Sequence, residues 1–177
     1  MEKILLHACC APCASYPIQK LALDNLKPVV FFYNPNIFPF EEYEIRRKEL
    51  KEYCAKNDIE YYEADYEIKE FYEAIKGFEN EPEKGKRCEI CFYLRLKKAA
   101  EFAKKLGIKR YTTTLSVSPH KNSIQIFEAA KKIDNGVEFV EYNFKKQDGF
   151  KKSRQIAKEN NMYFQTYCGC EFSRERQ

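Results

Sequence analysis

Short apolar segments alternate with longer amphipathic segments along the 177-residue chain. The apolar segments have the length and composition of buried strands and cover residues 3–8, 28–33, 59–64, 109–115 and 137–142. The segments between and after them have helical patterns and cover residues 15–26, 41–57, 66–78, 87–106, 123–134 and 150–161. Strands separated by helices of this length pair in parallel. The pattern predicts an α/β fold, a three-layer sandwich around a mainly parallel sheet. Since no linker interrupts it, residues 1–177 are expected to form a single domain.

Three unusual loops each follow one of the predicted strands. They are "CCAPC" at 9–13, "NPNIFPF" at 34–40 and "SVSPHKN" at 116–122. In parallel sheets, ligands bind in the loops at the carboxyl ends of the strands, and these ends share one rim. The three loops are therefore expected to meet at that rim and to form the functional site.

The cysteines give the most information about the chemistry of this protein. Seven of the eight cysteines fall in three tight groups, Cys9–Cys10–Cys13, Cys88–Cys91 and Cys168–Cys170. The eighth, Cys54, lies on the apolar stripe of its helix and is expected in the core. In a reducing cytosol such groups bind metal or perform redox chemistry, although a composition rich in Lys, Glu and aromatics leaves open the disulfides found in hyperthermophiles.

The spacing within the groups favours metal binding. Cys88 and Cys91 stand at the start of a helix and share one of its faces, and a helix N-terminus favours the thiolate. Cys168 and Cys170 flank a glycine that lets the backbone fold closely around a ligand. We expect the three groups to converge on one metal site at the rim. Four thiolates suffice for zinc or for an iron–sulfur cubane, so the remaining three would bind a second metal, contact substrate or form a redox disulfide.

The charge of the chain is compatible with a polyanionic partner. Net charge is +4, and lysine doublets recur along the second half of the sequence. These doublets fit either RNA phosphates or solvated helix faces balanced by nearby Glu. No segment has the roughly 20 apolar residues of a membrane span, and the first residues do not match a signal peptide. A cytoplasmic protein without a membrane partner is expected.

The motifs together resemble the cobalamin-independent epoxyqueuosine reductases of the QueH family. "LLHACCAPC", "NPNIFPFEEYEIR", "RCEICFYLRL", "TTTLSVSPHKN" and "YCGC" stand in that family's order and spacing. The resemblance implies a fold related to the PP-loop nucleotide-binding proteins, a [4Fe–4S] cluster and an adjacent iron ion. It also implies that the substrate is tRNA carrying epoxyqueuosine, whose epoxide oxygen is removed to give queuosine. "CCAPC" stands where ATP-using relatives have the S-G-G-x-D-S loop, which argues against an ATP-dependent adenylation mechanism.

The resemblance still leaves the cysteines to be divided between two tasks. Because neighbouring side chains diverge in an extended chain, each pair should split its members. We predict that Cys10, Cys88, Cys91 and Cys170 hold the cluster. Cys9, Cys13 and Cys168 would face the second iron or form a redox pair.

Other residues are candidates for substrate contacts and proton transfer. His120 is either the general acid or a turn residue that caps the following helix, whereas His7 is expected in the core. Lys121 and Arg95 are expected to bind phosphate. Asn34 and Asn36 would read the modified base, and Arg46 would contact the RNA backbone. An electron-donor protein or reductant is required. Two alternatives stay open: another iron–sulfur tRNA-modifying enzyme that transfers sulfur, and a non-catalytic RNA-binding protein stabilised by zinc.

Overall fold

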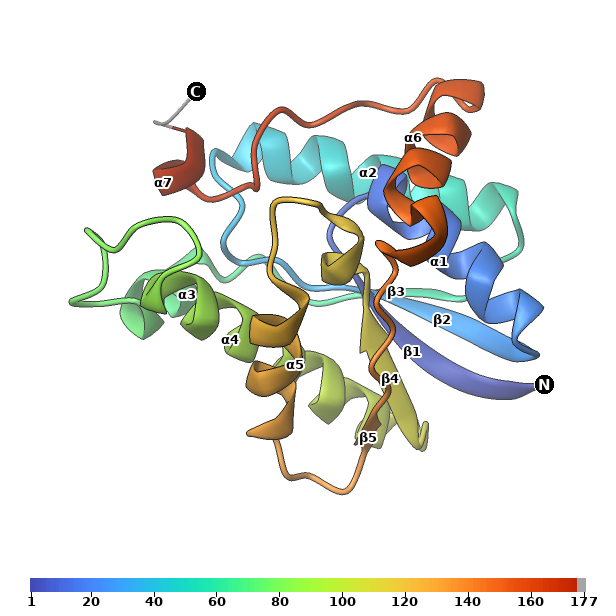
Figure 1. Ribbon diagram of the computed structural model, residues 1–177, viewed down its shortest axis with the longest axis horizontal. Helices are drawn as coiled ribbons and strands as arrows, with labels where there is room; N and C mark the ends of the chain where they lie inside the picture. The colour runs from blue at the N-terminus through green and yellow to red at the C-terminus, as the bar shows by residue number, and fades with distance from the viewer. Residues whose placement is uncertain (175–177) are drawn as a thin grey trace.

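Five parallel strands form the central sheet of the computed structural model, which describes residues 1–174 (Figure 1). The strands are β1 (Glu2–Ala8), β2 (Leu26–Phe32), β3 (Tyr61–Glu63), β4 (Arg110–Thr113) and β5 (Glu138–Phe139). Their order across the sheet is β3-β2-β1-β4-β5, and every neighbouring pair is parallel. In the central strand, Leu5 pairs with Val29 on one side and with Tyr111 on the other. The predicted parallel sheet is confirmed.

Helices cover both faces of this sheet. One layer contains α1 (Ala11–Leu23), α2 (Phe40–Lys56) and α6 (Gly149–Glu159). The other contains α4 (Lys86–Lys105) and α5 (Ser123–Lys131), and α3 (Ile68–Ala74) packs beside α4. The remaining helical turns are η1 (Thr114–Val117), η2 (Lys146–Asp148) and α7 (Glu171–Arg174). This arrangement is the expected three-layer sandwich.

Alternation along the strands divides the core between the two layers. In β1, Ile4 and Leu6 pack toward α1, α2 and α6, whereas Leu5 packs toward α4 and α5. Both faces of the sheet are thus buried, as parallel sheets require. Cys54 lies in the first of these cores and His7 is fully buried in β1, so both were predicted correctly.

The strand order places a crevice at the rim. The chain moves from β1 outward to β2 and β3, then returns to the other side of β1 with β4. At such a reversal the loops after the two central strands separate, and the opening between them is where ligands bind in α/β sheets. Here these loops begin at Cys9 and Thr114. The segment between α6 and α7 returns to the same rim (Figure 1).

Helix α1 begins at Ala11, earlier than predicted, so Cys13 belongs to its first turn rather than to a loop. Pro12 is compatible with this start because the first residues of a helix do not need their N–H groups. Within residues 1–174, no helix combines the length and the apolar character needed to cross a membrane.

Candidate metal centre

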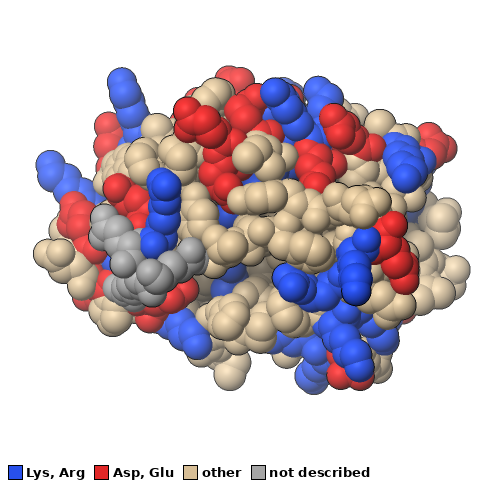
Figure 2. Space-filling view, turned by 90° about the horizontal axis from the view of Figure 1, so that it is seen from above, with Lys and Arg blue, Asp and Glu red and all other residues tan. Residues whose placement is uncertain are grey.

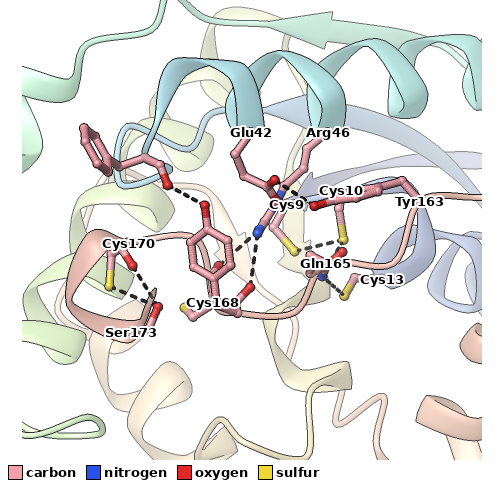
Figure 3. Close-up of polar contacts among 12 residues, drawn as sticks. Cys9, Cys10, Cys13, Glu42, Arg46, Tyr163, Gln165, Cys168, Cys170 and Ser173 are labelled. Atoms are coloured by element: carbon pink, nitrogen blue, oxygen red, sulfur yellow. Dashed lines mark hydrogen bonds and ion pairs between the residues drawn. The ribbon is translucent and has the colours of Figure 1, made fainter. Parts of the chain in front are cut away.

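The first three cysteines form a compact thiol group at the end of β1. The sulfurs of Cys9, Cys10 and Cys13 all lie within 4.8 Å of one another, and Cys9 Sγ lies 3.7 Å from Cys10 Sγ (Figure 3). The prediction that Cys9 and Cys10 point apart is therefore wrong. Strict alternation holds inside a strand, but β1 ends at Ala8 and Cys10 is the N-cap of α1. The turn into the helix brings both sulfurs to one side.

Contacts within this group favour one thiolate. Hydrogen bonds from Cys10 and Cys13 hold the pKa of Cys9 well below its usual value, although burial opposes this shift. Burial raises the pKa of Cys10, and hydrogen bonds with Cys13 and Cys9 raise it further. One negative sulfur beside two thiols is a suitable starting point for binding a cation, which would displace the remaining protons.

The other four of the seven grouped cysteines line a small cavity of about 30 Å³ beside α4. Cys88 and Cys91 come from the first turns of α4, and Cys168 and Cys170 from the segment before α7. Burial raises the pKa of Cys88, although the backbone N–H of Lys84 donates a hydrogen bond to its sulfur and opposes this shift. Burial also raises the pKa of Cys91 to about 12, despite the nearby Arg95 guanidinium. Cys88 and Cys91 would therefore ionise at neutral pH only when a cation is bound.

Buried polar groups beside the small cavity fit an anionic thiolate-bound centre. Arg95 is 1 % exposed; its Nε donates to Cys91 O (3.3 Å), and its Nη2 has no hydrogen-bond partner among residues 1–174. Asn36 is equally buried, and both polar atoms of its amide lack partners within the same residues. Buried polar groups are normally satisfied, so these atoms point to a ligand. A metal centre held by thiolates is consistent with such donors and with the Arg95 charge.

A large cavity of about 370 Å³ adjoins the small one. Cys9, Cys13, Lys121 and Cys168 line it, and Lys121 and Cys168 line the small cavity as well. Burial lowers the pKa of Lys121, but the sulfurs of Cys168, Cys9 and Cys13 raise it to a net value above the usual range. The three cysteine groups therefore meet around one lysine, at the rim predicted for them.

His120 is exposed and lines both cavities. It does not cap the following helix. That role belongs to Asn122, whose side-chain oxygen accepts hydrogen bonds from the backbone N–H groups of Ile124 (3.0 Å) and Gln125 (3.5 Å). Its position leaves His120 available to a molecule in either cavity.

Arg46 lies inside the protein, which corrects its predicted contact with the RNA backbone. The residue is 1 % exposed, and its Nε pairs with Glu42 Oε1 at 2.8 Å. Its two terminal nitrogens donate to the carbonyl oxygens of Cys168 and Tyr167, each at 3.1 Å (Figure 3). Asn34 is also internal and donates to Ala8 O at 2.9 Å. Arg46 therefore positions the segment that carries Cys168 and Cys170.

Gln165 was not singled out from the sequence. Its amide nitrogen lies 3.1 Å from Cys10 Sγ and 3.6 Å from Cys13 Sγ, so the segment after α6 crosses the first thiol group (Figure 3). The only signal in the sequence is its place five residues before Cys170. No periodicity marks a residue of an irregular segment.

A family model and individual relatives of this chain carry the same description. The model of the family described as "Epoxyqueuosine reductase QueH" matches residues 4–176. The protein of that name from Acinetobacter baylyi is 38 % identical, over 97 % of this chain and 80 % of the relative. The one from Thermotoga maritima is 36 % identical, over 98 % of this chain and 91 % of the relative.

A solved structure supports the fold alone. The U34-tRNA thiolase NcsA from Methanococcus maripaludis, with its [4Fe-4S] cluster, superimposes with a TM-score of 0.55 at 12 % identity. The match covers 98 % of this chain and 62 % of that chain. It agrees with the α/β fold expected from the PP-loop proteins. On the evidence of the family model and the close relatives, this chain belongs to the epoxyqueuosine reductase QueH family.

Proposed function

We propose that this protein reduces epoxyqueuosine in tRNA to queuosine. One observation carries the proposal: in a chain of this family, seven cysteines from three distant segments gather at the rim of the sheet, around Lys121. Removing an epoxide oxygen as water requires two electrons and two protons. The site must therefore hold a redox centre and supply a proton donor.

The thiolates are proposed to hold a [4Fe–4S] cluster, which supplies electrons one at a time when bound. Cys10, Cys88, Cys91 and Cys170 remain the proposed ligands. Because its sulfur lies 3.7 Å from that of Cys10, Cys9 is the alternative to Cys170. The thiols left over are proposed to hold an adjacent iron ion or to form a redox pair. The solved NcsA structure carries a [4Fe-4S] cluster on a similar fold.

Other residues of the rim are assigned to the substrate. His120, exposed beside both cavities, is proposed as the proton donor. Lys121 and Arg95 supply positive charge for a phosphate or for the centre itself. Asn36 is better placed than Asn34 to read the base, because its amide atoms have no partners among residues 1–174. The partners are a tRNA and an electron donor, and the proposed location is the cytoplasm.

The test is to purify the protein anaerobically, count iron, zinc and acid-labile sulfide per chain, and assay tRNA that contains epoxyqueuosine. We expect about four or five irons and about four sulfides, as for a cubane with or without a neighbouring ion. Digestion of the tRNA should then release queuosine. Zinc without sulfide, retained after anaerobic reconstitution, would support the structural zinc protein instead. Sulfur incorporated into the tRNA would support the sulfur transferase.

Cysteine variants assign the ligands in the same preparation. Cys88→Ala should lose both cluster absorbance and turnover, since a cubane that lacks a thiolate is labile. Cys54→Ala is the matched control, because Cys54 lies in the core, away from the rim. Comparing Cys9→Ala with Cys170→Ala then decides which of them is the fourth ligand.

A further inference from the structure

One wall of the large cavity has the character of a nucleic-acid contact. Phe150, Ser153 and Arg154 of α6 all line it. Their spacing of three and four residues places them on one face of the helix. Phe150 is 39 % exposed and lines the cavity, so part of its ring is accessible there. An exposed ring at this position offers a flat surface to a base.

Two polar atoms on this wall lack partners. Ser153 is 3 % exposed, and its Oγ makes no hydrogen bond within residues 1–174. The amide oxygen of Gln165, which also lines the cavity, is equally unpaired there. Buried polar atoms normally have partners, so this pair predicts polar groups on whatever occupies the cavity.

The charge of α6 distinguishes it from its neighbour α2. Helix α6 carries four cationic side chains, and within residues 1–174 none of them forms an ion pair with a carboxylate: Lys151, Lys152, Arg154 and Lys158. Four of the five cations of α2, by contrast, pair with Glu residues of α2 or of β3: Arg46, Arg47, Lys48 and Lys51. Figure 2 views this layer from outside and shows blue side chains gathered where α6 lies, whereas blue and red mix over α2. The lysine doublet at 151–152 therefore lacks, within residues 1–174, the Glu partners that a balanced solvated face would give it.

Arg154 is held in place for a contact with an anion. Its guanidinium carbon lies 4.1 Å from the centre of the Phe164 ring. A planar guanidinium stacked on an aromatic ring keeps its outer N–H groups free and loses little entropy on binding phosphate. Arg154 and Phe150 together thus place a fixed cation beside an exposed ring at the edge of the cavity.

We infer that this wall of α6 binds the single-stranded RNA next to the target nucleoside. Phe150 stacks on a neighbouring base and Arg154 binds a backbone phosphate. Ser153 and Gln165 hydrogen-bond the polar edge of the nucleoside in the cavity. Loop bases that are unstacked from a helix are recognised through such aromatic and cationic contacts. The inference rests on the proposed function, because it takes the anticodon loop as the ligand.

The first test measures binding of a fluorescently labelled anticodon stem–loop RNA by anisotropy, using the metal-loaded protein. Phe150→Ala should weaken binding about tenfold, the size of one lost stacking contact, and Phe150→Tyr should restore it. Neither variant should change the affinity for a duplex RNA of equal length, in which no base is free to stack. Equal affinities of Phe150→Ala and the unaltered protein for the stem–loop would overturn the inference.

The second test uses salt. Arg154→Gln should reduce the slope of log affinity against log salt by about 0.7, as expected for one lost phosphate contact to a single strand. Lys27→Gln is the matched control: it removes the same charge from an exposed residue at the amino end of β2, opposite the rim. Identical slopes for the two variants would show that Arg154 contributes only non-specific charge, and would overturn its assignment as a ligand of a backbone phosphate.

The third test separates folding from recognition. Ser153→Ala should leave the melting temperature unchanged or raise it, because the hydroxyl has no protein partner to lose. It should still weaken binding of tRNA that contains epoxyqueuosine. Turnover to queuosine with no effect of any α6 variant on binding would overturn the inference and leave the proposed function intact. Binding that depends on α6, without turnover to queuosine, would support the inference and overturn the proposed function.

Discussion

A single charged side chain inside the protein, Arg46, links α2 to the rim. It satisfies the carbonyl oxygens of Tyr167 and Cys168 and pairs with Glu42, which also accepts a hydrogen bond from Tyr163 Oη at 2.8 Å. Three groups on the segment after α6 thus depend directly or indirectly on one guanidinium. Removing it would leave a buried carboxylate and two carbonyls without their donor.

We predict that Arg46→Ala lowers the free energy of unfolding by about 3–5 kcal/mol, the usual effect of breaking a buried ion pair. It should also reduce the iron bound per chain. Arg46→Lys keeps the charge but cannot reach both carbonyls. Its free energy of unfolding and its iron content should therefore lie between those of the unaltered protein and of Arg46→Ala. Urea unfolding and iron analysis on the same samples provide the measurement. Unchanged iron in Arg46→Ala would mean that Cys168 and Cys170 do not need this anchor.

Sequence alone could not separate Arg46 from Arg47. Both follow acidic residues in one helix, and both have a Glu three or four positions earlier. Arg46 is buried under the returning segment, whereas Arg47 forms ion pairs with Glu44 and Glu63 at the surface. The difference comes from a segment more than a hundred residues later, which no local pattern reports.

At the level of helices and strands, prediction was accurate where periodicity exists. All five strands and six principal helices appear near their predicted positions, and the loops after β1, β2 and β4 meet at one rim. What was missed is irregular: the earlier start of α1, the turn η1, and the course of residues 160–170. These depend on side-chain contacts with distant backbone groups rather than on an apolar repeat, so the sequence carried no local signal for them.

The start of α5 offers a test at this scale. Asn122→Ala removes the side-chain acceptor for two backbone N–H groups and should lower the free energy of unfolding by about 1 kcal/mol. Asn122→Ser should retain most of the stability, because serine is also a good N-cap. Urea denaturation distinguishes the two. If both variants lost the same amount, the capping bond would not be the cause.

Across the whole molecule, the titrating groups favour instability in acid. Burial lowers the pKa of His7 to about 4, and its ring nitrogens contact Thr113 Oγ1 and Tyr33 O, each at 2.9 Å. Hydrogen bonds from Arg47 and Lys3 lower the pKa values of the Glu44 and Glu60 carboxyls. In each case the folded protein binds its proton less readily than the unfolded chain.

We therefore predict that the free energy of unfolding falls as the pH drops below about 6.5. Between that pH and about 4, the unfolded chain protonates His7 while the folded protein does not, a difference worth about 3 kcal/mol. Below about pH 4.5 the carboxylates add to the loss. Urea unfolding across this range, with iron followed in parallel, gives the measurement. A flat profile between pH 6.5 and 4 would contradict the burial of a neutral His7.

The path of the returning segment has a consequence for biosynthesis. The amide of Gln165 reaches Cys10 across 155 positions of sequence, and the partners of Cys88 and Cys91 at the rim come from residues 168 and 170. During translation the first thiols leave the ribosome long before the chain that will cover them. Until the last segment docks on α2, these thiols are open to oxygen and to stray metals. We therefore expect a metal centre that uses both the first thiols and Cys168 or Cys170 to be loaded only after residues 168–170 have been synthesised and have docked at the rim.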